Sequence, residues 1–183
     1  MTTSAFPIPS QRKLVRLAYQ DYLQNYGVPY LGTVFAARPV ILGEEQYTQT
    51  MNGMAIEQSE NGSCAVLVVN ITDEHRVPEA LAGRFAVNDS VAYHMLLELW
   101  FASTAGDAIE AQFDYDDVAS TLEVAIRANP TPGGGDVVWS GGEFEVGVDH
   151  HQDEPYSTDE GLTVLINGRI NFDAYAWLSG QGV

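Results

Sequence analysis

A long apolar strand followed directly by the longest helical pattern in the chain constrains the fold most, and both lie between Val91 and Asn129. Every second strand position is apolar, namely Val91, Tyr93, Met95, Leu97, Leu99 and Phe101. Because side chains alternate across a strand, these six share one face, which we expect to be core. The other face is mixed and consists of Ala92, His94, Leu96, Glu98 and Trp100. Either another element of the chain or another subunit could half cover such a face.

The helical pattern over 107–128 spaces its apolar residues alternately by three and four positions, which is typical of one buried helix face. These residues are Ala108, Ala111, Tyr115, Val118, Leu122 and Ala125. Asp114, Asp116 and Asp117 should form a solvated row, and Asn129-Pro130 should end the helix. A helix that follows a strand packs back on the sheet, so this pair predicts a two-layer core.

The other patterns predict a second helix and further strands. The helix should run from Ser10 to about Tyr26, with Gly27 as its C-cap. Strands are expected over Tyr30–Ala37, Cys64–Thr72 and Leu162–Phe172, with pieces at Val137–Trp139 and Phe144–Val148. Asn167-Gly168 could form a hairpin turn, but that turn would mix apolar and polar residues on one face, so we expect a continuous strand. Tyr175, Trp177 and Leu178 should follow as a buried apolar tail.

These elements predict a single α+β domain over residues 1–183, with a mixed, mainly antiparallel sheet of about five strands packed against two helices. We expect its long loops to contact partners. The segment 40–62 is irregular yet apolar, with Tyr47, Met51 and Met54 in it, and should form an extended hairpin or loop on a partner. Residues 73–90 should form a polar connection, and residues 149–161 an exposed acidic loop.

The formal net charge is −17, from 25 acidic and 8 basic residues, which argues against a sequence-reading DNA binder. Solubility alone accounts for most of these charges, and they would also suit a surface that DNA slides past. Arg12, Lys13 and Arg16 cluster near the start of the first helix, either as a solvated face, which we favour, or as a contact for an acidic partner.

Compartment and membrane signals point to a protein made and used in a reducing cytoplasm. The single cysteine, Cys64, excludes an intrachain disulfide. The first residues lack the charged and apolar regions of a signal peptide, and no apolar run is long enough to span a bilayer.

No catalytic, cofactor or metal site is predicted. His150-His151 is flanked by acidic residues, but adjacent residues of an extended chain point apart, and no second ligand cluster is visible. His94 and Glu98 share a strand face but lie ~13 Å apart by the strand rise, too far for a direct pair. Because nucleophile-elbow, zinc-protease and dinucleotide-binding motifs are all lacking, we do not expect an enzyme.

Taken as ordered blocks, most of the chain resembles the tail terminator proteins of long-tailed bacteriophages. The blocks are the N-terminal helix with 28–39, then Ala65–Ile71, Val91–Ser103 with Asp107–Asn129, 137–143 and Phe172–Leu178. The resemblance implies an α+β fold and a ring, usually of six copies, at the head-proximal end of the tail tube in the virion, assembled in the host cytoplasm. It also implies contacts with the tube protein and with head–tail connector proteins, and a central channel through which DNA passes.

A closed ring needs two different contact patches on each subunit. We place them on the segment 40–62, through Tyr47, Met51 and Met54, and on the mixed strand face, through His94, Glu98 and Trp100. The alternatives are another head–tail connector or a tail-tube ring subunit and, from a different class, a small acidic ligand-binding module or an unrecognised enzyme.

Overall fold

A computed structural model describes residues 11–38, 62–78, 89–104, 107–128, 132, 139–140, 147–157 and 163–178. Within these ranges the helices are α1 (Gln11–Asn25) and α3 (Ala108–Ala128). The strands are β1 (Leu31–Phe35), β2 (Ser63–Pro78), β3 (Asp89–Ser103), β4 (Trp139–Ser140), β5 (Asp149–Gln152), β6 (Tyr156–Ser157) and β7 (Val164–Leu178). The segment 40–62 lies outside the described residues except for Gly62, so the predicted loop and its Tyr47, Met51 and Met54 do too.

The strands form one mixed sheet in the order β1-β2-β3-β7-β4, and the short strands β5 and β6 also pair with β7. Among the described strands, the β1–β2 pair is parallel and the other pairs are antiparallel. The predicted α+β class, with a mainly antiparallel sheet and two helices, is therefore confirmed.

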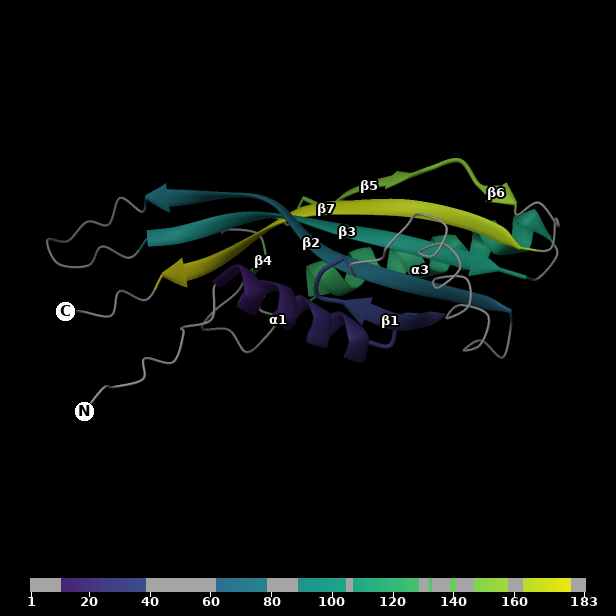
Figure 1. Cartoon of the computed structure of the whole chain (residues 1–183), viewed down its shortest axis with the longest axis horizontal. Helices are drawn as coiled ribbons and strands as arrows, with labels where there is room; N and C mark the ends of the chain where they lie inside the picture. Colours follow the sequence, from purple (N-terminus) through teal and green to yellow (C-terminus); the bar gives the residue numbers. More distant parts are fainter. Residues whose placement is uncertain are drawn as a thin grey trace, which may run out of the picture.

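Three long strands, β2, β3 and β7, form the centre of the sheet, and their ribbons extend past the N-terminal end of α1 (Figure 1). Their register places Leu99 of β3 between Leu67 of β2 and Gly168 of β7. The predicted strand Val91–Phe101 is confirmed and is longer by two residues at each end.

The β2 strand runs six residues beyond Thr72, so the expectation of a polar connection over 73–90 is wrong for 73–78 and 89–90. An irregularity between Ile71 and Asp73 allows the strand to continue. Such a bulge shifts the alternation by one residue, so that Glu74 lies opposite the core residue Tyr93. Polar sequence alone suggested a loop, whereas cross-strand pairing extends the hairpin.

Both helices pack on one face of the sheet, which we call the inner face. Tyr19 of α1 contacts Phe172 edge to face with ring centroids 5.1 Å apart, and Tyr115 of α3 meets Phe101 at 6.0 Å. All six apolar residues predicted for the core face of β3 are buried. On α3 the predicted stripe is buried apart from Ala108, which lies exposed in the first turn.

The C-terminal strand confirms the choice of a continuous strand over a hairpin at Asn167-Gly168. It is also longer than predicted, because the expected tail at Tyr175, Trp177 and Leu178 continues β7 instead of following it. Pairing with β3 along its whole length, from Ser103–Val164 to Asp89–Leu178, accounts for the extension.

The acidic segment 149–161 was predicted to be a loop, and this is wrong for two stretches of it. Asp149–Gln152 and Tyr156–Ser157 pair with β7 as β5 and β6. His150 and Gln152 lie opposite Ile170 and Gly168, which face α3, so both side chains are directed toward that helix.

Candidate oligomerisation surface

The outer face of the sheet, opposite both helices, contains the mixed side of β3. Alternation and register place Val66 and Val68 of β2, His94, Glu98 and Trp100 of β3, and Asn167, Arg169 and Asp173 of β7 on this face. Val66 and Val68 are buried, whereas His94 and Arg169 are exposed. The outer face is therefore apolar and covered at Val66 and Val68 of β2. It is polar and open at Arg169 of β7, which is level with Val68, and at His94 farther along β3.

Glu98 is held within the chain. Its carboxylate accepts a hydrogen bond of 2.9 Å from Nη2 of Arg38, and only 14% of the Glu98 side chain is exposed. Arg38 follows the edge strand β1, so its side chain must extend over β2 to reach β3. Part of the mixed face is thus covered by the chain itself, which was one of the two possibilities left open by the sequence.

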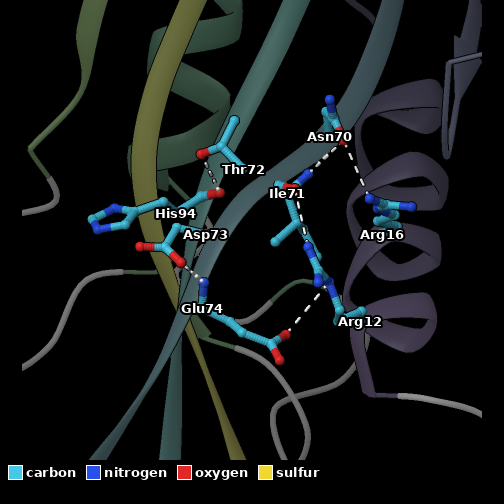
Figure 2. Close-up of polar contacts among 8 residues, drawn as sticks. All are labelled: Arg12, Arg16, Asn70, Ile71, Thr72, Asp73, Glu74 and His94. Atoms are coloured by element: carbon cyan, nitrogen blue, oxygen red, sulfur yellow. Dashed lines mark hydrogen bonds and ion pairs between the residues drawn. The ribbon is translucent and has the colours of Figure 1, made fainter.

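His94 lies at the open end of the outer face and pairs through Nδ1 with the carboxylate of Asp173. The ring of His75 lies 5.8 Å from that of His94, measured between centroids. His94 and Asp73 lie on the side of the sheet away from α1 (Figure 2). His94 and Glu98 each pair elsewhere, as their separation along the strand predicts. Trp100 is half-buried on the same face.

The sequence favoured a solvated face for Arg12, Lys13 and Arg16. This interpretation is wrong for Arg12 and Arg16, whose side chains contact β2 of the same chain. Arg12 donates to the carbonyl of Ile71 at 3.2 Å and pairs with Glu74 at 3.4 Å. Arg16 donates to Oδ1 of Asn70 at 3.2 Å. These contacts meet β2 beside its bulge (Figure 2). Burial, and then the neighbouring charge of Arg12, lower the pKa of Arg16.

Side chains of α1 form hydrogen bonds with backbone groups of the edge strand β1. Gln24 accepts the N–H of Val34 at 2.8 Å and donates to the carbonyl of Gly32 at 3.2 Å. Gln20 donates to the carbonyl of Val34 at 2.8 Å. Edge strands expose unpaired backbone groups that can recruit a strand from another chain. The two glutamines therefore occupy the positions that such a strand would use.

A polar cluster joins α3 to the opposite edge of the sheet. The hydroxyl of Tyr115 lies 2.9 Å from Nε2 of His150, and Nδ1 of His150 lies 3.5 Å from Glu123. Gln112 and Gln152 exchange two hydrogen bonds, of 3.0 and 2.8 Å. Burial, and then the charges of Asp116 and Asp153, raise the pKa of Tyr115. The periodicity predicted Tyr115 as core but gave no sign of its polar partner.

Gly168 provides the space for that cluster. A Cβ atom at this position would lie 1.9 Å from the Tyr115 hydroxyl oxygen. A glycine inside a strand often marks such a close approach, and this was the one sequence signal that could have indicated the cluster.

The solvated row expected on α3 is wrong at one position. Asp114 accepts a hydrogen bond from the hydroxyl of Tyr30 at 3.0 Å and another from Ser63 at 2.8 Å. Asp116 and Asp117 are exposed as expected. Asp114 thus links the start of β1 and the start of β2 to α3, and its hydrogen bond, followed by burial, raises the pKa of Tyr30.

His150 and His151 point in different directions, as expected for adjacent strand residues. His150 reaches the Tyr115 cluster, whereas His151 is exposed with Nε2 3.5 Å from Asp153. Within the described ranges, no three His, Cys, Asp or Glu side chains are grouped so that they could hold a metal ion. Neither described helix combines the length and apolar character needed to cross a membrane.

Neither protein-family models nor curated protein sequences yield a match to this chain.

Proposed function

We propose that this chain is a structural virion protein of a long-tailed bacteriophage, which forms a ring at the head-proximal end of the tail tube. The ring ends tube polymerisation, provides the surface to which the filled head docks, and leaves a central channel for DNA. Its partners are further copies of itself, the tube protein and the head–tail connector proteins. The copy number of six follows from the family resemblance.

The open end of the outer sheet face is the observation that carries this proposal. Both helices pack on the inner face, while the outer face continues past Glu98 to exposed polar residues at Asp73, His75 and His94. On the same face the half-buried Leu96 lies between His94 and Glu98, and the half-buried Trp100 follows beyond Glu98. A surface that combines half-buried apolar side chains with exposed polar ones has the composition of a protein–protein interface. We therefore assign this face to a neighbouring subunit.

The charge balance is compatible with a channel for DNA. With 25 acidic residues against 8 basic ones, the chain offers few cations to hold phosphates in place. DNA can then pass the ring without adhering to it. In this proposal the protein contacts DNA only through proximity, and its role is structural, not catalytic.

The second patch of the ring is assigned to the segment 40–62, which carries Tyr47, Met51 and Met54. Deleting residues 44–58 should abolish ring formation while the monomer keeps its fold, which circular dichroism would report. Rings of normal size from this deletion variant would remove the segment from the contact.

The deciding experiment combines negative-stain microscopy of the purified protein with native mass measurement across a concentration series. A closed ring with a central hole is the expected result. Open tubes would instead indicate a tube subunit. A monomer that gains stability on binding a small ligand would indicate a ligand-binding module.

A second experiment addresses termination itself. Tails assembled without this protein should be overlong and should lack heads. Tails of normal length, or overlong tails that still join heads, would contradict the terminator assignment even if the purified protein forms rings.

A further inference from the structure

The side of α3 that faces away from the sheet carries three large apolar side chains. Ile109 is 63% exposed, Phe113 64% and Val124 55%. At about 3.6 residues per turn they fall within an arc of roughly 60°, opposite the buried face of the helix. Asp116 and Asp117 lie exposed on the same side. We call these five residues the α3 stripe.

Large exposed apolar side chains gathered on one side of a helix can mark an interaction site. No residue of the α3 stripe contributes to the buried core, which uses Tyr115, Val118 and Leu122 on the other side. The stripe also differs from the outer sheet face, since α3 packs on the inner face. It is therefore a separate candidate for an interface.

The helix α1 offers a surface of matching character. Leu14 and Leu17 are 37% and 40% exposed, and Lys13 is exposed beside them. Along their whole lengths, α1 carries three basic residues and one acidic residue, while α3 carries five acidic residues and one basic residue. Arg12 and Arg16 are directed to β2 of their own chain, so the basic group beside the exposed leucines is that of Lys13.

The spacing of the two surfaces agrees as well. Lys13 and Leu17 are four residues apart on α1, as Phe113 and Asp117 are on α3. Four residues span about one helical turn, or roughly 6 Å. If α1 of one copy lies antiparallel to α3 of the next, Leu17 meets Phe113 at the same time as Lys13 meets Asp117.

We propose that the α3 stripe of one subunit binds the α1 face with Lys13, Leu14 and Leu17 of a second copy. The two surfaces are different parts of the same chain, so the contact is heterologous and can repeat around a ring. This inference rests on the proposed ring and names a subunit contact within it. Attraction between the acidic and basic surfaces would fix the orientation of neighbours.

The test uses native mass measurement and sedimentation of the full chain across a concentration series. The double variant Ile109→Gln and Phe113→Gln should weaken ring formation on the order of ten-fold or more, since buried aromatic anchors dominate interfaces. Tyr156→Gln on β6 is the matched control, because it also removes an exposed apolar side chain, 45% exposed, and should assemble as the wild type does. Thermal unfolding should be close to wild type in both, since these are surface positions.

Exchanging the charges of Lys13 and Asp117 then tests whether these two residues contact each other directly, or whether assembly is weakened only because apolar surface is lost. Lys13→Glu and Asp117→Lys should each weaken assembly, and combining them should restore it to within about three-fold of wild type. Rings from the stripe variants, or no recovery in the combined variant, would overturn this contact and leave the ring itself intact. A wild-type chain that stays monomeric throughout the series would overturn both this contact and the ring from which it follows.

Discussion

Replacing Gly168 with alanine should destabilise the fold through a single steric conflict. The new Cβ atom would lie 1.9 Å from the hydroxyl oxygen of Tyr115 and 3.1 Å from its Cζ. Tyr115 is fully buried, so its ring cannot turn out into solvent. It has to shift within the core, which separates its hydroxyl from His150, now 2.9 Å away.

The magnitude follows from three contributions. Leaving a buried hydroxyl without its hydrogen bond costs about 1–3 kcal/mol. Overpacking a core costs about 1–3 kcal/mol. Alanine recovers about 0.4–1 kcal/mol because it restricts the unfolded chain. The net loss is about 3 kcal/mol, which for a chain of this size lowers Tm by roughly 6–12 °C.

Urea denaturation followed by circular dichroism measures this loss, and a double-mutant cycle assigns it to one pair of residues. Tyr115→Phe alone should cost about 1 kcal/mol, because it removes the hydrogen bond to His150. In the Tyr115→Phe background, Gly168→Ala should cost less than in the wild type, since the clashing oxygen is gone and only the 3.1 Å contact with Cζ remains. Gly147→Ala is the control, because its Cβ meets no atom within 4 Å, and it should leave stability unchanged.

Equal costs of Gly168→Ala in the two backgrounds would refute this reasoning. A Gly168→Ala variant as stable as the wild type would do the same, since it would show that the hydroxyl of Tyr115 does not occupy the space above Gly168.

Three further predictions concern other parts of the fold. Replacing Gln20 and Gln24 with alanine should cost about 1 kcal/mol per lost hydrogen bond and expose the β1 edge, so light scattering should detect strand-mediated aggregation that the wild type does not show. Raising the pH should destabilise the protein, because burial raises the pKa of Tyr115. The stability that the folded state gains from holding Tyr115 as a neutral phenol is complete below the ordinary tyrosine pKa of about 10 and is lost at higher pH. Urea midpoints between about pH 8 and 11 should therefore fall less steeply for Tyr115→Phe than for the wild type. Burial raises the pKa of the Cys64 thiol, so an aromatic disulfide reagent should react slowly with the native protein and rapidly in urea, and fast reaction in the native state would contradict the buried position.

Periodicity by itself determined the two central elements of this protein. The alternation from Val91 to Phe101 and the three-and-four spacing from Ala111 to Ala125 each encode a face, because consecutive side chains point in fixed directions along a strand or helix. The same logic rejected a turn at Asn167-Gly168, since a turn would have placed apolar and polar residues on one face. The α+β class followed from these local patterns, while the viral function rests on the family resemblance and stays a proposal.

The tertiary structure alone decided where polar segments pair and which side chains meet across the chain. Residues 73–78 and 149–152 are polar enough to read as loops, yet the backbone hydrogen bonds of a neighbouring strand hold them in the sheet. The contacts of Arg38 with Glu98 and of Tyr115 with His150 join residues 60 and 35 positions apart. Sequence periodicity describes only near neighbours, so contacts at such separations depend on strand register and helix placement, which are fixed when the layers pack.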